Sequence, residues 1–375
     1  MKKVVIAIDS FKGCLPSVEA GKAAAEGIRS VYPECEVICL PIADGGEGML
    51  DVLITATNGQ EVPISAHDPL MRWRNTYYGI SENGETAFIE MASISGLPLV
   101  PPERRNPMLT TTYGTGEIIS DALERGCRNF IIGIGGSATN DAGLGMLQAL
   151  GFHFSDKEGK EVGTGRGEIL IKVAHIDSTF VHPALNSCRF TVACDVQNPF
   201  YGPEGAAYVF APQKGADREM VEALDAGLQN LAEVIRHTTG KDISHHPGAG
   251  AAGGMGGSLL AFLNAELKPG IQLMLEALDF SNKIKSADLI ITGEGKADRQ
   301  TLMGKVPSGI LAEARKQNIP VILLAGNIED SDELQQAGFE GVFSVNPPFI
   351  SLEEAMRPEV ARKNIQQTVE CICKK

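Results

Sequence analysis

Five short segments place carboxylates, glycines and lysines directly after runs of apolar residues. They are residues 9–13 (DSFKG), 44–48 (DGGEG), 133–141 (GIGGSATND), 195–198 (DVQN) and 293–298 (GEGKAD). Open α/β sheets bind ligands beyond the carboxyl ends of their strands. Glycine lets the backbone approach a ligand closely, and the N–H groups at a helix start favour phosphate or carboxylate. Five such loops together indicate a site for an anionic ligand.

Carboxylates in these loops are candidate ligands for a divalent cation. Asp44 and Glu47 lie three residues apart at a predicted helix start, where a carboxylate could instead cap the helix. Mg²⁺ prefers hard carboxylate oxygens. We therefore expect a magnesium site whose candidate ligands are Asp44, Glu47, Asp141 and Glu294.

Asp195 ends the apolar run RFTVAC and is followed by Asn198-Pro199. A carboxylate held on a buried strand is a candidate general base or metal ligand. The alternative is a turn formed by Asp195 and Asn198. Lys12 follows a strand-end Asp and Ser, and it is either a ligand-binding cation or a solvated surface lysine. The sequence around each residue leaves both interpretations of Asp195 and both interpretations of Lys12 open.

Known nucleotide-binding motifs match only weakly. GIGGSA (133–138) fits the dinucleotide pattern G-x-G-x-x-A, but no acidic residue ends a strand about 20 residues later. No stretch fits the Walker A pattern, and no HRD or DFG of protein kinases is present. A phosphoryl-transfer enzyme with this sequence must therefore use another loop design. The alternatives are a nicotinamide-dependent 2-hydroxy-acid dehydrogenase and a non-catalytic protein that binds small anions.

The elements that carry these loops predict an α/β fold with two domains. Strands are expected at 3–8, 36–42, 287–293, 320–326 and 341–345, with helices at 17–30, 47–57, 304–317, 331–337 and 352–373. Such alternation indicates a doubly wound parallel sheet of the flavodoxin or Rossmann type. Ser17 is the expected N-cap of the first helix.

The middle of the chain has a mixed pattern. Residues 60–90 alternate apolar and polar positions around Asn83-Gly84, which predicts an antiparallel hairpin or meander. Further strands are expected at 129–134 and 189–195 and helices at 115–126, 141–151 and 217–239. We therefore predict a discontinuous domain of residues 1–65 and 285–375, an inserted mixed α/β domain of residues 66–284, and an active site in the cleft between them. Two sequential domains with a break near residue 200 are the alternative.

Composition excludes several classes of partner. The net charge of −14 and the pI of about 5.0 disfavour binding to nucleic acid or to anionic lipid. No apolar run approaches the roughly 20 residues of a membrane span, and Asp9 interrupts the N-terminal apolar run. The eight cysteines form no CxxC pair, so we expect reduced thiols. These features predict a cytoplasmic protein, a monomer or homodimer, that binds small molecules.

Ten strings, in order along the whole chain, carry a family resemblance: DSFKG (9–13), LPIADGGEG (40–48), IEMASISGL (89–97), RNPMLTTTYGTGE (105–117), GIGGSATNDAG (133–143), CDVQNPF (194–200), APQKGA (211–216), GAAGGMGG (250–257), NAELKPGI (264–271) and TGEGKADRQT (292–301). Together they resemble the bacterial glycerate kinases of the type that includes the glycerate 2-kinases of glyoxylate and galactarate breakdown. The resemblance implies ATP-dependent phosphorylation of D-glycerate, usually to 2-phosphoglycerate, with Mg²⁺ bridging the nucleotide phosphates.

Candidate roles follow from the resemblance and from the loops. We expect Asp195, Lys12 and Lys296 to be catalytic. Glycerate is expected to meet Ser10, Asn198, Asp298 and Lys305, and ATP to meet Gly133, Gly135, Gly136, Ser137, Gly293 and Gly295.

Two residues depart from the family pattern. Lys296 stands where the family commonly has Arg, which keeps the charge but loses a planar fork. Ala142 stands where the family commonly has Gly, which adds a methyl group beside the 133–141 loop. Both bear on substrate preference more than on the reaction.

Overall fold

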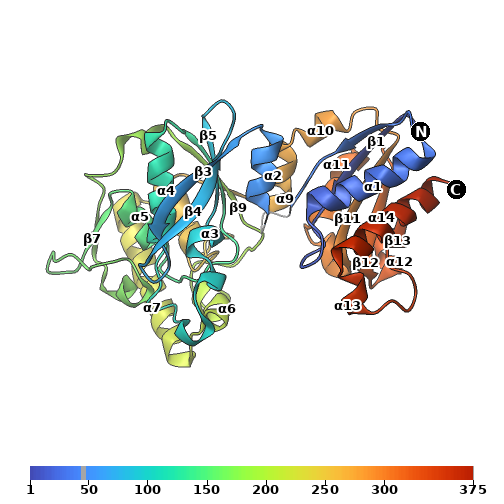
Figure 1. Cartoon of the computed structure of the whole chain (residues 1–375). Helices are drawn as coiled ribbons and strands as arrows, with labels where there is room; N and C mark the ends of the chain where they lie inside the picture. Colours follow the sequence, from blue (N-terminus) through green and yellow to red (C-terminus); the bar gives the residue numbers. More distant parts are fainter. Residues whose placement is uncertain (44–47, 375) are drawn as a thin grey trace. The chain divides into compact units, whose positions relative to one another are not determined.

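The computed structural model describes residues 1–43 and 48–374, so the predicted metal ligands Asp44 and Glu47 lie outside the described residues. The chain divides into two compact units (Figure 1). We call Met1–Asp44 together with Ile271–Lys375 the terminal unit, and Gly45–Gly270 the central unit. The sequence-based boundaries lay at 65 and 284 instead. They differ because the strand beginning at residue 60 pairs within the central unit, and because two helices between 270 and 284 precede the returning parallel strands.

The sheet of the terminal unit has five parallel strands in the order β13-β12-β11-β1-β2. In chain order they are β1 (Lys3–Ile8), β2 (Glu36–Cys39), β11 (Leu289–Ala297), β12 (Val321–Ile328) and β13 (Gly341–Ser344). The run VVIAI of β1 is buried throughout. A strand covered on both faces needs apolar residues at consecutive positions, which explains this unbroken run.

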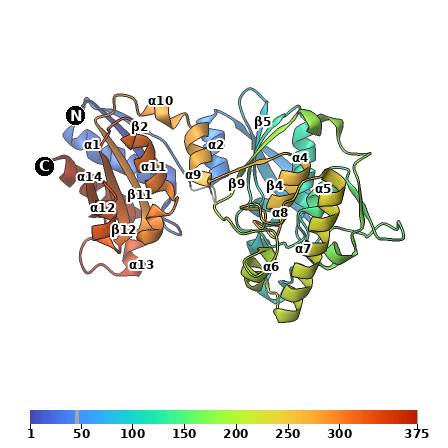
Figure 2. The same cartoon turned by 180° about the vertical axis from the view of Figure 1, so that it is seen from behind.

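Helices cover both faces of this sheet, which confirms the doubly wound prediction. The helices α1 (Ser17–Val31) and α14 (Pro358–Cys373) lie side by side on one face, and α11 (Val306–Arg315) lies on the other (Figures 1 and 2). The shorter helices of this part of the chain are α9 (Gly270–Ala277), α10 (Phe280–Lys283), the 3₁₀ turn η6 (Arg299–Leu302), α12 (Ser331–Gln336) and α13 (Leu352–Ala355).

The central unit contains a six-stranded sheet in the order β10-β9-β6-β5-β4-β3. Its strands are β3 (Gln60–His67), β4 (Trp73–Ile80), β5 (Thr86–Glu90), β6 (Asn129–Gly133), β9 (Arg189–Ala193) and β10 (Glu266–Lys268). The three strands β3, β4 and β5 form the predicted antiparallel meander, and the other pairs are parallel. The sheet is therefore mixed, and it is separate from the sheet of β1.

Helices and short turns complete the central unit. The helices are α2 (Met49–Ala56), α3 (Ala92–Ser95), α4 (Tyr113–Glu124), α5 (Leu144–Ala149), α6 (Ala206–Phe210), α7 (Arg218–Thr239) and α8 (Met255–Phe262). A small antiparallel pair joins β7 (His153–Ser155) to β8 (His175–Asp177), and 3₁₀ turns cover Leu97–Leu99, Pro102–Arg104, Gly167–Lys172, Pro183–Ser187 and Pro212–Lys214. The stacked rings of Phe130 and Phe190, with centroids 4.7 Å apart, lie in its core.

Two local expectations were wrong. Ser17 is not the N-cap of α1, because Pro16 holds that position. The Ser17 hydroxyl instead donates to the Ile8 carbonyl (2.6 Å) and accepts from the Ile42 amide (3.0 Å), so it joins the ends of two strand segments. The predicted helix over 352–373 is two helices, since Pro358 cannot continue the turn before it.

All eight cysteines are free thiols, which agrees with the reduced state expected from the sequence. Within residues 1–43 and 48–374, the chain contains no helix that is both long and apolar enough to cross a membrane.

The contact between α1 and α14 generates a stability prediction. A Cβ added at Gly27 would lie 2.5 Å from the Gln366 carbonyl oxygen of α14, whereas one at Gly21 would meet its nearest neighbours at 3.9 Å. We expect Gly27→Ala to lower the free energy of unfolding by about 1–3 kcal/mol through overpacking. Gly21→Ala, in the same helix, is the control and should raise it by up to about 1 kcal/mol through helix propensity. Urea unfolding measures both, and equal midpoints for the two variants would contradict this account.

Candidate functional site

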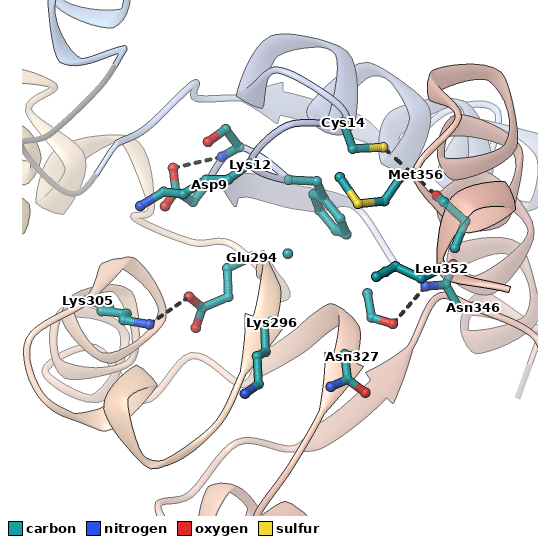
Figure 3. A pocket seen from close by; sticks show the side chains of 15 residues that line it. Asp9, Lys12, Cys14, Glu294, Lys296, Lys305, Asn327, Asn346, Leu352 and Met356 are labelled. Carbon is teal, nitrogen blue, oxygen red and sulfur yellow. Dashed lines mark hydrogen bonds and ion pairs between the residues drawn. The ribbon is translucent and has the colours of Figure 1, made fainter. Parts of the chain in front are cut away.

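The terminal unit has a ligand-type cavity where its strand order reverses. The chain passes from β1 to β2 on one side, while β11 lies on the other side of β1. Such a reversal opens a crevice at the carboxyl ends of the strands. A cavity of about 320 Å³ lies there, and it is lined by the segments that follow β1 and β13 and by the ends of β11 and β12 (Figure 3).

Two buried carboxylates stand next to each other at one side of this cavity. Asp9 follows β1 and Glu294 lies in β11, and the Asp9 amide donates to the Gly293 carbonyl (2.9 Å). The two residues are 6 % and 7 % exposed. One Asp9 oxygen accepts from the Ser10 amide (2.7 Å), which fixes the side chain within its loop. Predicted residue Ser10 therefore lines the cavity and orients Asp9.

Glu294 is held by one hydroxyl and one cation. One carboxylate oxygen accepts from the Thr301 hydroxyl (2.6 Å), and the other lies 3.6 Å from the Lys305 ammonium. Burial raises the pKa of the Glu294 carboxyl, and Thr301 and Lys305 partly offset that rise. Figure 3 shows Glu294 and Lys305 facing each other at the polar side of the cavity. Lys305 immediately precedes α11, whose N-terminal amides favour an anion.

Lys296 pairs with two carboxylates on the same edge of the sheet. Its ammonium lies 2.9 Å from Glu329 and 3.5 Å from Asp298. The hydrogen bond with Glu329 raises the pKa of Lys296. Asp298 also caps the turn η6 by accepting from the Gln300 amide (2.8 Å). Although burial raises the pKa of Asp298, this amide and the two lysines hold it below its usual range.

The other side of the cavity is apolar. The loop after β1 folds back on itself, with mutual hydrogen bonds between the backbones of Phe11 and Leu15 (2.8 and 2.9 Å). Phe11 and Cys14 of this turn line the cavity together with Leu352 and Met356 of the α13 region. Figure 3 shows Cys14 beside Met356. Sequence reasoning assigned no function to any of these apolar residues.

The two predicted nucleotide-binding glycines of β11, Gly293 and Gly295, have different surroundings. A Cβ at Gly293 would lie 2.4 Å from the Leu324 carbonyl oxygen of the neighbouring strand, so packing within the sheet explains this glycine. A Cβ at Gly295 would meet only the Phe11–Lys12 backbone at 3.5 Å, which is ordinary contact. Gly295 lines the cavity together with Lys12.

In the central unit, the 133–141 loop is held by a buried lysine. Lys214 is 2 % exposed, and its ammonium donates to the Ser137 hydroxyl (2.7 Å) and to the Thr139 carbonyl (2.6 Å). Burial lowers the pKa of Lys214 to about 7, although the Asp141 carboxylate acts in the opposite direction. The predicted residue Ser137 is therefore a lysine-bound hydroxyl, and Gly133 ends β6 before it.

Two further predicted glycines occupy this loop. Gly136 has a φ of +72°, a conformation that favours glycine. A Cβ at Gly135 would have no neighbour within 4 Å. The backbone at Gly135 is therefore open to an approaching ligand, as the sequence interpretation requires.

Asp141, predicted as a metal ligand, is completely enclosed. Its carboxylate accepts from the Thr112 amide and hydroxyl (both 2.8 Å) and from the amides of Gly143 (3.1 Å) and Gly145 (3.2 Å). These bonds join the start of α4 to the 141–145 stretch and favour a structural role over metal coordination. Ala142 next to it has a φ of +53°, which explains why the family pattern commonly has glycine there.

The same loop contains buried polar side-chain atoms that have no hydrogen-bond partner. The Thr139 hydroxyl and both atoms of the Asn140 side-chain amide are buried with no hydrogen-bond partner. Buried amides and hydroxyls in folded proteins are nearly always paired with protein, water or ligand. The Thr139 hydroxyl and the Asn140 amide are therefore hydrogen-bonding groups beside Lys214 that a ligand or a water molecule could pair.

The structure places Asp195 and Asn198 after β9, at the carboxyl end of the central sheet. Asp195 is exposed and accepts from the Gly270 amide (2.8 Å). The Asn198 side chain donates to the Glu204 carbonyl (2.8 Å), so it stiffens its own loop. Asn198 therefore braces its own loop, while the Asp195 side chain is exposed.

No group of three or more His, Cys, Asp or Glu side chains converges as a metal site within residues 1–43 and 48–374. Mg²⁺ in kinases is commonly held by one or two carboxylates plus substrate phosphates. The adjacent carboxylates of Asp9 and Glu294, beside three cavity lysines, fit that kind of site. Asp298 and Glu329 are already paired with Lys296.

Sequence reasoning left two functional candidates without a role. Asp9 ends a buried strand and belongs to one of the five loops, so its position was a usable signal. Lys214 had none, because a lysine in the motif APQKGA is normally exposed and only the folded structure reveals its burial.

Comparison with known proteins agrees with this architecture. Residues 4–375 match the Glycerate kinase family. The chain is 48 % identical to glycerate 2-kinase of Escherichia coli K12, with 95 % of this chain and 93 % of that one covered. It is 46 % identical to glycerate kinase of Bacillus subtilis 168, with 94 % and 92 % covered.

A solved structure is similar over the whole length. A crystal structure from Salmonella typhimurium LT2, provisionally described as glycerate kinase 2, has a TM-score of 0.91 and 43 % identity, with 100 % of this chain and 97 % of that chain covered. With the family matched from residue 4 to the end of the chain, this protein belongs to the glycerate kinase family.

Proposed function

We propose that this chain transfers the γ-phosphoryl group of ATP to D-glycerate and releases 2-phosphoglycerate. The observation that carries the proposal is the strand-end cavity of the terminal unit, where Lys12, Lys296 and Lys305 meet the carboxylates of Asp9 and Glu294. Membership of the glycerate kinase family supplies the substrate class. Phosphoryl transfer depends on positioning and charge neutralisation, and this cavity offers both.

The lysines are the groups that neutralise charge on the transferred phosphoryl group. Lys305 and Lys296 already face carboxylates, at 3.6 Å and 2.9 Å. These ion pairs orient the ammonium groups before any anion binds. An incoming phosphate or glycerate carboxylate therefore meets pre-positioned donors, and we assign Lys12 and Lys296 to catalysis and Lys305 to the substrate, with Ser10 and Asp298 shaping the same edge.

A magnesium ion would be held by Asp9 and Glu294 together with nucleotide phosphates. When bound, Mg²⁺ offsets the negative charge that builds on the phosphoryl oxygens. Burial of both carboxylates in the cavity wall favours such pairing with a cation.

Asp195 stays our candidate for the general base, with Asn198 beside it. Its carboxylate is exposed at the end of a rigid strand, and the Gly270 amide fixes one of its oxygens. A base must lie within hydrogen-bond reach of the hydroxyl proton that it accepts. In the same unit, the glycine loop with Gly135 and Ser137 offers backbone and hydroxyl donors to an anion.

Neither alternative function gains support. A nicotinamide enzyme needs an acidic residue for the ribose at the end of the next strand of the same sheet. Asp156 follows β7, but β7 pairs with β8 in a separate two-stranded sheet and not with the sheet of β6. A non-catalytic anion-binding protein needs cations alone. The pairing of carboxylates with lysines at the cavity favours chemistry on a metal-bound phosphate.

The first prediction concerns the reaction itself. We expect ADP formation to require both D-glycerate and Mg²⁺, and phosphorus NMR to show 2-phosphoglycerate as the product. Glycerol is the control, because it keeps the hydroxyls but lacks the carboxylate that the lysines would bind. ADP release at the same rate with and without D-glycerate would refute the proposal.

The second prediction concerns Asp195. Asp195→Asn keeps an acceptor for the Gly270 amide but loses the charge, so kcat should fall by about 10²–10⁴-fold with little change in Tm. Asp217→Asn is the matched control, because Asp217 is also exposed and accepts one backbone amide (2.9 Å). A kcat within about threefold of wild type would move the base to Asp44, Asp298 or Glu294.

The third prediction concerns Lys214 and pH. The unfolded chain carries an ordinary lysine with a pKa of about 10.4, whereas the folded chain holds Lys214 at about 7. Between these values the unfolded state binds more protons, so the contribution of Lys214 to stability rises with pH. Relative to Lys214→Met, wild type should gain about 2 kcal/mol between pH 7 and pH 9.

Urea unfolding at the two pH values measures this gain. Lys157→Met, which removes an exposed lysine of the central unit, is the control. Parallel pH curves for wild type and Lys214→Met would show that the buried ammonium keeps its ordinary pKa.

A further inference from the structure

The cavity of the terminal unit is divided between two kinds of chemistry. At one side lie Asp9, Glu294 and Lys305, and at the other lie Cys14, Leu352 and Met356 (Figure 3). The apolar side chains of Phe11 and Ala355 also line the cavity. D-Glycerate has three carbons, all bearing oxygen, so it cannot cover an apolar wall. A triphosphate likewise fits only the charged side. The apolar side therefore needs a different part of a ligand.

We propose that the apolar side of this cavity binds the adenosine of ATP, with the triphosphate running toward Lys12, Lys296 and Lys305. This assignment rests on the proposed function and adds the unit and the wall that hold the nucleoside. Ligand pockets are typically apolar clefts of roughly 300–1,000 Å³ with a few fixed polar groups. The cavity of about 320 Å³ meets that description.

Exposure of the wall supports this assignment. Leu352 is 76 % exposed and Met356 is 38 % exposed, and both face the cavity rather than packing into the core. Large apolar side chains gathered around a concave site commonly mark a binding surface. Methionine, in particular, has an unbranched and polarisable side chain that packs well against a flat ring.

Asn346 supplies a fixed polar group for the edge of the base. Its side-chain NH₂ donates to the Gly326 carbonyl (2.8 Å), and its side-chain oxygen accepts from the Asn364 side chain (3.2 Å). These two bonds set the orientation of the amide and leave one N–H and one lone pair. An Asn amide binds adenine bidentately at N6 and N7 when its remaining N–H and lone pair lie on the same edge of the amide. Asn346 therefore adds a base-recognising group to the apolar wall.

The first test fills the apolar side. Ala355 is 8 % exposed and lines the cavity, so Ala355→Phe adds a ring where the base would lie. The terminal unit has a second cavity, of about 670 Å³, which Ala312 lines. Ala312→Phe adds the same ring there and is the matched control. Calorimetric titration with ADP and with inorganic tripolyphosphate, each with Mg²⁺, reports on the two sides separately.

We expect Ala355→Phe to raise the Kd for ADP by at least about tenfold, because the added ring occupies the volume of the base. The Kd for tripolyphosphate should stay within about twofold, and Ala312→Phe should change neither. An unchanged Kd for ADP in Ala355→Phe would overturn the assignment. An equal loss for both ligands would also count against it, since the effect would then lie on the phosphate side.

A second measurement uses the wild-type chain and does not depend on how a variant folds. Cys14 lines the apolar side, whereas Cys371 is exposed elsewhere on the same unit. MgADP should slow alkylation of Cys14 by N-ethylmaleimide by about tenfold or more and leave Cys371 unchanged, as read by peptide mass spectrometry, whereas tripolyphosphate should protect neither. Equal alkylation of Cys14 with and without MgADP would overturn the assignment.

These outcomes separate the binding site from the reaction. If glycerate-dependent ADP formation occurs while ADP neither protects Cys14 nor responds to Ala355→Phe, the function stands and the nucleoside lies elsewhere. If ADP protects Cys14 but no phosphoglycerate forms, the nucleoside site stands and the proposed reaction fails.

Discussion

The site of the terminal unit depends on one strand pair, β1 with β11. These strands are almost 300 residues apart in the chain, and their parallel register sets Ile8 opposite Gly293. That register puts Asp9 beside Glu294 and brings the loop of Lys12 to the edge that carries Lys296 and Lys305. A slip of one residue would turn every side chain of a strand to the opposite face. The complete burial of the VVIAI run therefore protects the geometry of the site as well as the fold.

Buried charges in this chain are compensated by specific partners. Burying an ion costs several kcal/mol, and only good local geometry offsets that cost. Glu294 has Thr301 and Lys305, Asp141 has four donors, and Lys214 has two oxygen acceptors. Such groups add little to stability, yet they fix loops in one conformation. In both units these loops lie at the carboxyl ends of strands, where ligands bind.

Sequence patterns predicted the parts of this structure that depend on local order. The apolar runs located the strands of the terminal sheet and β3, β4, β5, β6 and β9 of the central sheet, but they missed the three-residue strand β10. Strand ends followed by glycine and carboxylate drew attention to Asp9, Glu294 and Lys296. They could not reveal Lys214, because burial of a lysine depends on segments more than 70 residues away. They also did not reveal that packing against the Leu324 carbonyl of β12 requires glycine at position 293. The apolar wall was missed because Leu352 and Met356 are far from Phe11 in the sequence, and only the fold brings the three side chains to one cavity.

An acidic protein can bind an anion where its positive charge is local. The chain carries a net charge of −14, yet three lysines line one cavity. Two of them rest against carboxylates, so a phosphate must compete with Glu294 for Lys305 and with Glu329 for Lys296. A cation bound at Asp9 and Glu294 would remove the competition for Lys305 and free that lysine for phosphate. Metal and nucleotide should therefore bind more tightly together than apart, and the apolar wall adds affinity that does not depend on charge.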